Sequence, residues 1–405
     1  MNAITRSALA IGIASALAAG AAQAQMSDNV IKIGVLSDMS SLYTDLAGAG
    51  SVVAARMAVE DSGVEKRGLK VEVVSADHQN KPDVGSAVAR QWYDADKVDV
   101  IVDVPNSGVA LAVNQITKDK NKVFLAVGPG TSDLTGKACT PNTVHWSYDT
   151  WMLANGTGTA ITKQGGDTWF FITADYAFGQ ALERDTTQAV QKAGGKVIGS
   201  VKVPLNNQDF SSFLLQAQSS KAKIIGLANA GGDTTNSIKQ AAEFGIVKGG
   251  QNLAGLLVFL TDVHALGLQN AQGLIVTTSF YWDANDQTRA FAKRFAAVDK
   301  GIHPTMVHAG VYASVLHYLK AVEALKSDDG TKVVAKMKEM PTDDPLFGKG
   351  TIRADGRKIH PAYLFEVKKP SESKGPWDYY KLIGTTPGEQ AFRPLSESAC
   401  PLVKK

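Results

Sequence analysis

The sequence predicts an α/β protein that consists of two doubly wound, Rossmann-like lobes. From Asn29 onward, strand patterns alternate with helix patterns, and strands that are joined by helices favour a parallel sheet. The same alternation begins again after Val144. In addition, about 380 residues follow the N-terminal segment 1–24. A single hydrophobic core usually organises fewer residues than this. Two lobes of similar build are therefore expected.

The first series contains four strand patterns and three helix patterns. Its clearest unit runs from Val98 to Gln115, where an unbroken apolar stretch gives way to a helical pattern across the polar turn Asn106–Gly108. This unit is a strand, a turn and a helix. The first series as a whole predicts strands at 30–38, 69–77, 98–104 and 122–128 and helices at 47–61, 84–95 and 109–120.

The second series repeats the unit of strand and helix, and this repetition marks the second lobe. A long helix is then expected over Met306–Leu325, because apolar residues recur on one face. The final part of the chain predicts a hairpin whose turn contains Asp355–Gly356. The second series predicts strands at 167–173, 196–204, 222–230, 254–261 and 273–282 and helices at 174–185, 209–220 and 231–244.

Residues 1–24 have the pattern of a secretory signal peptide. Arg6 precedes an apolar run from Ala8 to Ala22, and signal peptidase accepts Ala22-Gln23-Ala24, so cleavage is expected after Ala24. The run is too short and too rich in alanine for a spanning helix, and no later run reaches the ~18 apolar residues that a span needs. A retained anchor is the alternative. We expect an exported, soluble protein.

Composition and motifs argue against several classes of function. The formal net charge of +3 comes without a basic tract, so no nucleic-acid partner is expected. The chain contains no GxxxxGK[ST], HExxH or GxSxG motif, and Gly48-x-Gly50 lacks the third glycine of a dinucleotide fingerprint. The seven histidines are scattered rather than paired at metal-ligand spacing. We therefore expect no catalytic residues, no metal and no cofactor, and a small molecule as the partner.

The chain has two cysteines, Cys139 and Cys400. Disulfides persist in the oxidising compartments that an exported protein reaches, so the economical interpretation pairs the two residues. A reactive thiol and a metal-ligand pair are the less well supported alternatives. A disulfide would tie the C-terminal tail to the first half of the chain.

The residues that follow the predicted strands form the candidate binding site, because ligands of open parallel sheets collect beyond the carboxyl ends of the strands. Small residues let backbone N–H groups approach a ligand, helix N-termini favour anions, and aromatic rings supply an apolar wall. Taken alone, each such residue could equally serve an ordinary turn or helix cap. The first series contributes Ser40, Tyr43, Asn106, Ser107, Gly128, Gly130 and Thr131, and the second contributes Tyr176, Asn229 and Asp262.

Several segments resemble the Leu/Ile/Val-binding type of periplasmic solute receptor, which serves ABC importers. They are IKIGVLSDMSSLY, GAGSVVAARMAVED, VDVIVDVPNSGVALAV, VFLAVGPGTSDLTG, TADYAFGQAL and GLANAGGDTTNSIKQA. The resemblance covers the whole mature chain and implies a type I periplasmic binding protein, whose two lobes are joined by three crossovers and close around a ligand. It also implies a periplasmic location, the permease subunits of an ABC importer as membrane partners, and a monomer.

The resemblance further implies how the chain is divided. Crossovers are expected near 145–149, 278–282 and 347–352. The N-terminal lobe then comprises residues 28–145 and 280–346, and the C-terminal lobe comprises residues 146–279 and 347–405. The ligand would lie between them.

In the resembled family, the turns after the third and fourth strands hold a carboxylate with hydroxyl groups and backbone amides. In this chain those turns contain Asn106 and Ser107, and Gly128, Gly130 and Thr131. Amino-acid receptors of the family usually place a glutamate against the ammonium group of the ligand. The matching position here is Asp262, whose shorter side chain disfavours an α-amino ligand.

The segments DMSSLY, HWSYDTW, SFYWDAND and TADYAFG more closely resemble receptors that collect aromatic carboxylates. Tyr43, Tyr148, Tyr176 and Tyr281 would then face the ligand, with Asp149 beside them. The predicted ligand is therefore a small carboxylate with an aromatic body. A branched-chain or other amino acid, an amide such as urea, and a role as an exported ligand-sensing domain are the alternatives.

Overall fold

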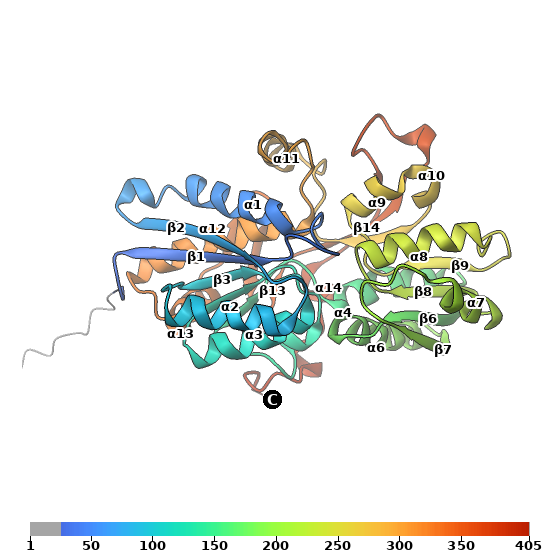
Figure 1. Cartoon of the computed structure of the whole chain (residues 1–405), viewed down its shortest axis with the longest axis horizontal. Coiled ribbons are helices and arrows are strands. Elements are labelled where there is room, and N and C mark those ends of the chain that lie inside the picture. Colours follow the sequence, from blue (N-terminus) through green and yellow to red (C-terminus); the bar gives the residue numbers. More distant parts are fainter. Residues whose placement is uncertain (1–25, 405) are drawn as a thin grey trace, which may run out of the picture.

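The computed structural model of the chain describes residues 26–404, so the predicted signal peptide lies outside the described residues. Residues 26–404 form two α/β lobes that lie side by side (Figure 1). Each lobe contains its own parallel sheet, as the sequence predicted. Within the same residues, no helix combines the length and the apolar character that a bilayer span requires.

The first lobe is organised around a five-stranded parallel sheet in the order β2-β1-β3-β4-β5. Helices cover both faces, so the buried strands are apolar on both sides. Ile33 and Val35 of β1 belong to the core that faces α1 and α12, whereas Leu36 belongs to the core under α2 and α3. The strands are β1 (Val30–Ser37), β2 (Lys70–Asp77), β3 (Val100–Asp103), β4 (Val123–Ala126) and β5 (Thr143–His145), and the helices are α1 (Gly48–Ser62), α2 (Pro82–Asp94), α3 (Ser107–Asp119), α12 (Met306–Leu325) and α13 (Gly330–Glu339), with short 3-10 turns at Glu65–Arg67 and Ser132–Thr135.

The second lobe contains a four-stranded parallel sheet in the order β7-β6-β8-β9. Ile172 of β6 packs in the core under α7 and α8, and its neighbour Phe171 packs on the opposite face with α6. The strands are β6 (Thr168–Ala174), β7 (Lys196–Val203), β8 (Ile224–Ala228) and β9 (Asn252–Gly255), and the helices are α4 (Thr150–Leu153), a π-helical turn (Ala154–Gly158), α5 (Thr159–Lys163), α6 (Ala177–Lys192), α7 (Ser211–Ser219), α8 (Gly232–Glu243), α9 (Leu260–Leu266) and α10 (Leu268–Ala271).

Two small antiparallel sheets complete the fold. One has the order β10-β14-β15 and the other β11-β12-β13. The hairpin between β12 and β13 contains the predicted Asp355–Gly356 turn, and α12 has the predicted bounds. The remaining elements are β10 (Ile275–Thr278), α11 (Asp286–Val298), β11 (Thr342–Asp344), β12 (Gly348–Ile352), β13 (Lys358–Ile359), β14 (Ala362–Val367), a 3-10 turn (Pro370–Glu372), β15 (Tyr380–Thr386), α14 (Gly388–Ala391) and a last 3-10 turn (Leu395–Glu397).

The predicted strand over 254–261 is wrong beyond Gly255, where β9 ends and a loop leads into α9. The Asp262 carboxylate accepts the backbone N–H of Phe259 at 2.8 Å and so stabilises the start of this helix. The residues between the two elements are buried. An unbroken apolar run does not distinguish a buried strand from a buried loop or helix start, which explains the error.

The chain passes between the two lobes three times. It leaves the first lobe after β5, returns between β10 and α11, and leaves again between β13 and β14. The third passage comes later than the predicted 347–352, because β12 pairs with β11 and β13 beside α13 instead of crossing. The predicted assignment of residues 347–405 to the second lobe therefore does not hold for β12 and β13, whereas the assignment of 28–145 plus 280–346 and of 146–279 stays a prediction.

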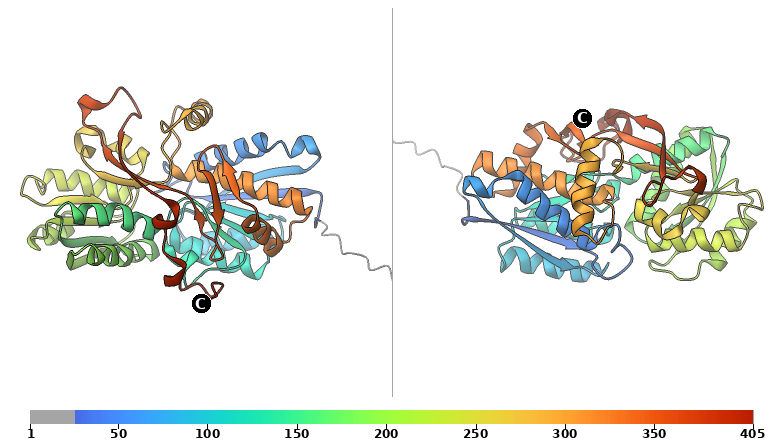
Figure 2. Two further views of the ribbon diagram at one scale, coloured as in Figure 1. Left: turned by 180° about the vertical axis from the view of Figure 1, so that it is seen from behind. Right: turned by 90° about the horizontal axis from the view of Figure 1, so that it is seen from above.

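The C-terminal tail returns to the first lobe after β15. In Figure 2 the tail runs along the junction of the two lobes. A disulfide joins Cys400 to Cys139, which lies in the loop before β5, and the two Cα atoms are 5.6 Å apart. The tail therefore connects the lobes in addition to the three passages of the chain.

Candidate ligand-binding cleft

The turn after β3 combines a capped helix start with a free hydroxyl hydrogen. The side-chain oxygen of Asn106 accepts the backbone N–H groups of Gly108 at 2.9 Å and Val109 at 3.1 Å, and so caps α3. Ser107 is fully buried, and its Oγ accepts the N–H of Thr131 at 3.2 Å. A hydroxyl that accepts a hydrogen bond keeps its own hydrogen for donation. This turn can therefore donate to an anion at the N-terminus of α3.

Three tyrosines from the two lobes meet beside Pro105 of this turn. Tyr43 follows β1 and Tyr176 follows β6, and their hydroxyl oxygens are 2.5 Å apart, so this contact joins the lobes. Tyr148 donates its O–H to the carbonyl of Gly128 at 2.5 Å. Burial raises the pKa of Tyr43, Tyr148 and Tyr176 above the usual value for a phenol. All three side chains are therefore neutral hydrogen-bonding groups near pH 7.

These tyrosines line an apolar pocket between the lobes. The other walls include Leu46, Phe178, Leu257 and Phe259. The pocket has a volume of only about 10 Å³. That space suits a single water molecule. An organic ligand can therefore enter only when the two lobes separate.

Gly130 follows β4 and lies between two of the pocket's aromatic rings. A Cβ atom at this position would lie 2.6 Å from Cε2 of Phe178 and 3.0 Å from Cε2 of Tyr148. We expect Gly130→Ala to lower the free energy of unfolding by ~1–3 kcal/mol, the usual cost of overpacking a core, and to weaken ligand binding. Chemical denaturation with and without ligand measures both effects. Gly384→Ala is the control, because its Cβ would meet its nearest neighbour at 3.7 Å, and equal behaviour of the two variants would contradict this account.

A polar groove of about 430 Å³ also lies between the two lobes and shares Leu46 with the tyrosine pocket. Ser40 and Asp45 of the first lobe and Thr261 and Asp262 of the second lobe line it. The Ser40 hydroxyl is engaged with Asp77, to which it donates at 2.5 Å. Burial raises the pKa of Asp262 to about 7, and the nearby carboxylate of Asp45 acts in the same direction. The carboxylate of Asp262 is thus committed to the start of α9 and faces the groove rather than the tyrosine pocket.

Comparison with known proteins decides the family of the chain. The family model described as periplasmic binding protein matches residues 30–375. This chain belongs to the periplasmic binding protein family. The predicted relationship to Leu/Ile/Val-binding receptors and the predicted type I fold are confirmed. Receptors of this family bind solutes for ABC importers in the periplasm, and the family and fold of this chain are those of solute-binding proteins.

Three solved structures illustrate the similarity. A periplasmic binding protein from Burkholderia mallei is 54% identical with a TM-score of 0.90, over 93% of this chain and 100% of that chain. A branched chain amino acid ABC transporter periplasmic ligand-binding protein from Burkholderia xenovorans LB400 is 43% identical with a TM-score of 0.82, over 92% and 100%. An ABC transporter solute binding protein from R. palustris in complex with benzoate is 22% identical with a TM-score of 0.80, over 92% and 99%, which shows the shared fold alone.

Besides Ser40 and Asp262, which line the groove, three of the predicted ligand residues of this receptor lie away from the tyrosine pocket. Asn229 precedes α8 and donates from Nδ2 to the Ser237 hydroxyl at 3.0 Å. Tyr281 packs against Tyr380 in the second lobe, with 5.1 Å between the ring centroids. Asp149 caps α4 and belongs to an ion-pair cluster at the junction of the lobes. Roles of these three residues toward a ligand stay predictions.

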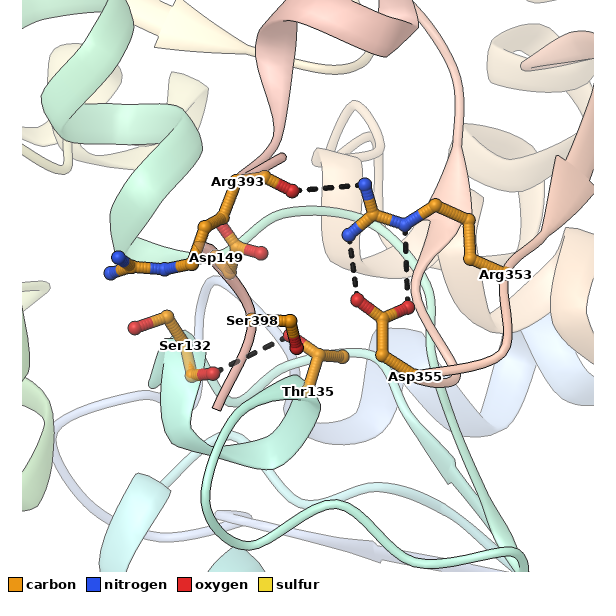
Figure 3. Close-up of a pocket in the computed structure, with 7 residues that line it drawn as sticks. All are labelled: Ser132, Thr135, Asp149, Arg353, Asp355, Arg393 and Ser398. Atoms are coloured by element: carbon orange, nitrogen blue, oxygen red, sulfur yellow. Dashed lines mark hydrogen bonds and ion pairs between the residues drawn. The ribbon is translucent and has the colours of Figure 1, made fainter. Parts of the chain in front are cut away.

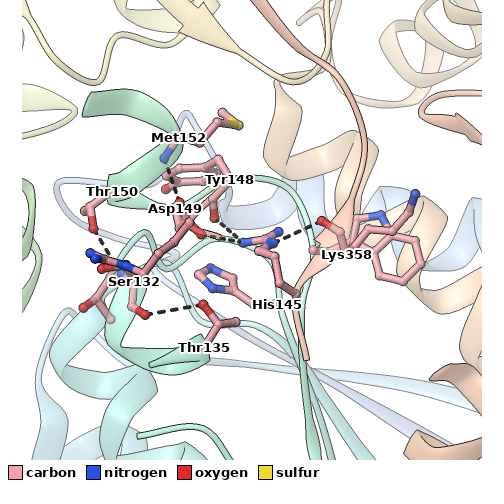
Figure 4. Close-up of polar contacts among 12 residues, drawn as sticks. Ser132, Thr135, His145, Tyr148, Asp149, Thr150, Met152 and Lys358 are labelled. Atoms are coloured by element: carbon pink, nitrogen blue, oxygen red, sulfur yellow. Dashed lines mark hydrogen bonds and ion pairs between the residues drawn. The ribbon is translucent and has the colours of Figure 1, made fainter. Parts of the chain in front are cut away.

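Asp149 and Arg357 form the fully buried ion pair of this cluster. Nη1 of Arg357 donates to the carbonyl of Tyr148 at 3.0 Å and lies 3.5 Å from Oδ2 of Asp149. Figure 4 shows the other contact of Asp149, whose Oδ1 accepts the N–H of Met152 at 2.8 Å. Burial raises the pKa of Asp149 and lowers that of Arg357 to about 10, and each partner opposes the shift of the other. The phenyl ring of Phe392 in the tail covers the guanidinium group, 4.6 Å from its centroid.

Asp185 of α6 joins the tail and both lobes in the same cluster. It accepts hydrogen bonds from the Ser132 hydroxyl at 2.7 Å, the Thr150 hydroxyl at 2.6 Å and Nη2 of Arg393 at 3.0 Å. Arg353 donates to the backbone carbonyl of Arg393 at 2.9 Å (Figure 3). The cavity among these side chains has a volume of only about 10 Å³. The cluster therefore supports the junction of the lobes.

Sequence reasoning missed several residues of the receptor's pocket and junction. Leu257 and Phe259 were included in the predicted strand 254–261, so the prediction did not place their side chains in the pocket between the lobes. Asp262, three residues after Phe259, was the available signal, because an acidic residue in the first turn marks a helix start. Asp149 and Arg357 are 208 residues apart in the chain, and no local pattern indicates such a pair.

Proposed function

We propose that this receptor binds a small carboxylate with an aromatic body between its lobes and delivers it to the permease of an ABC importer. The observation that carries this proposal is the apolar pocket of tyrosines beside the turn at Pro105–Ser107. The ligand carboxylate would accept the Ser107 hydroxyl at the N-terminus of α3. Its ring would contact Tyr43, Tyr148 and Tyr176, whose hydroxyls suit polar ring substituents.

An amino-acid ligand would require an acidic partner for its ammonium group. Asp262 is the residue expected for this role. Its carboxylate already accepts the Phe259 N–H and lines the groove, whereas the tyrosine pocket contains no carboxylate among its lining residues. These contacts support an aromatic acid over a branched-chain amino acid.

A ligand screen by thermal shift tests the proposed class. Benzoate and its hydroxylated derivatives should raise Tm in proportion to the logarithm of their concentration above Kd, because they bind the folded receptor only. Leucine, valine and urea should not. Stabilisation by leucine or valine, with no effect of benzoate-type acids, would replace the aromatic assignment by an amino-acid one with Asp262 as the ammonium partner.

We expect Ser107→Ala to weaken binding of the carboxylate about tenfold or more. The hydroxyl would donate to an anion, and such a charge-assisted hydrogen bond contributes about 1.5–3 kcal/mol. Isothermal titration calorimetry measures the change in Kd. Ser211→Ala is the matched control, because Ser211 also begins a helix, α7, on the outside of the second lobe. Unchanged affinity in Ser107→Ala would place the carboxylate elsewhere.

We also propose that the exported receptor begins after Ala24 and is a monomer. Mass spectrometry of the periplasmic protein determines the first residue, and sedimentation equilibrium determines the oligomeric state.

A ligand-sensing role would use the same fold and cleft. Uptake of labelled benzoate in cells with and without the receptor distinguishes transport from sensing.

A further inference from the structure

Asp103 is the last residue of β3 and precedes the turn that contains Ser107. The backbone at Asp103 and at the next residue is strained. The φ angle is +83° at Asp103 and +59° at Val104. Aspartate tolerates the left-handed region, but a β-branched residue in it is an outlier. Strain of this kind persists only where the surrounding structure imposes it, and it concentrates at ligand sites. The strained pair leads directly into the turn that contains Ser107.

The carboxyl group of Asp103 is fully buried beneath the turns after β3 and β4. Oδ2 accepts the Ser37 hydroxyl at 2.7 Å, whereas Oδ1 has no hydrogen-bond partner among residues 26–404. A Cβ atom on Gly128 would lie 2.4 Å from Oδ1, so this oxygen lies directly against the second turn. Tyr148 donates to the carbonyl of the same glycine. Asp103 is thus adjacent to both turns that would hold the ligand carboxylate.

No cation of the described chain faces Asp103. The groups that face it are the hydroxyls of Ser37 in β1 and Ser51 in α1, the carboxylate of Asp38 and the phenol of Tyr148. Burial raises the pKa of Asp103 to about 7, the serine hydroxyls oppose this shift, and Asp38 adds to it. A buried carboxyl oxygen without a partner is costly as an anion, whereas the neutral acid can donate a hydrogen bond.

We propose that Asp103 is a positioning residue that must carry a proton when the receptor binds an anionic ligand. An ionised Asp103 places a second negative charge behind the turns that hold the ligand carboxylate, and the two charges repel. The protonated acid removes this repulsion. Binding is then accompanied by uptake of one proton, which comes from solvent and stays on the carboxyl group. This inference rests on the proposed function, because it requires a carboxylate near Ser107.

The pH dependence of Kd for benzoate tests this proposal. In the wild-type receptor, Kd should be constant below about pH 6 and should rise up to about tenfold per pH unit above about pH 7, because only the protonated form binds. In Asp103→Asn, Kd should not depend on pH. Asparagine has the size of aspartate, does not ionise and tolerates a positive φ. Calorimetry in two buffers of different ionisation enthalpy should show uptake of one proton at about pH 8 in the wild type and none in the variant.

Two further variants identify the group responsible. Asp262 also has a pKa of about 7 and lines the groove, so it is the competing explanation. Asp262→Asn should retain the wild-type slope of Kd against pH, whatever its affinity. Asp99→Asn, just before the other end of β3, should retain it as well. The proposal is overturned if Kd still depends on pH in Asp103→Asn, or if Kd no longer depends on pH in Asp262→Asn.

A ligand-independent measurement separates this inference from the proposed function. The carboxyl carbon of Asp103 should titrate near pH 7 in a ¹³C NMR experiment on the free receptor, and its signal should be absent in Asp103→Asn. Titration near pH 4 overturns the inference whichever ligand binds. If Asp103 titrates near pH 7 but benzoate-type acids bind at no pH, the proposed ligand class fails. The Kd of the anion that the screen then identifies must show the same dependence on pH.

Discussion

Replacement of both cysteines, in the variant Cys139→Ala with Cys400→Ala, should lower the free energy of unfolding by ~5 kcal/mol. The two residues are separated by 261 positions, and the crosslink removes the entropy of a long loop from the unfolded chain. Urea denaturation of the oxidised receptor and of the variant measures the difference. The wild type in the presence of a reducing agent should behave like the variant. A loss below ~1 kcal/mol would show that the disulfide does not constrain the unfolded chain in this way.

Removal of Arg357 should have the second large effect. Arg357→Met leaves the carboxylate of Asp149 buried without its cation, and breaking a buried ion pair from one side costs ~3–5 kcal/mol. Because burial raises the pKa of Asp149, an unpaired Asp149 destabilises the folded state as pH rises above the pKa of the unfolded residue. The loss should therefore be larger at pH 8 than at pH 4.5. Urea denaturation at both pH values measures it.

A double variant provides the control for this second prediction. Asparagine at position 149 can still accept the N–H of Met152 but carries no charge. Arg357→Met with Asp149→Asn should be more stable than Arg357→Met alone, and its stability should vary less with pH. Equal stability of the two variants at pH 8 would mean that the lost packing of Arg357 on Phe392, rather than the unpaired charge, dominates.

The arrangement of strands and helices was predictable because each element carries its own periodicity. The unit from Val98 to Gln115 and the helix Met306–Leu325 have strong local patterns, and the structure has both. The segment after Gly255 has a strand-like composition, but its conformation depends on the capping contact between Asp262 and Phe259. The position of the third passage depends on the pairing of β12 with β11 and β13, which a local pattern does not specify.

The candidate site was predictable at the strand ends and not at the junction of the lobes. Ser107, Thr131 and Tyr148 lie together because the carboxyl ends of parallel strands meet at one edge of a sheet. The contact between Tyr43 and Tyr176 depends on how the two lobes approach each other, and this approach has no signal in a single sequence. The left-handed backbone at Asp103 and Val104 could not be predicted either, because the strand pattern VDVIVDV continues through both residues.

The place of α12 in the first lobe has a consequence for the order of folding. Figure 1 shows this helix beside α1 on the first sheet, and Val311 and Val315 of α12 share a core with Ile33 of β1. Until the second sheet and α11 have been synthesised, only α1 covers that face of the sheet, and α12 completes the cover afterwards. The strands β6–β9 and helices α6–α8, in contrast, form one continuous segment with local connections, which folds fastest. The second lobe should therefore fold first, and the N-terminal part of the chain should reach its stable form last.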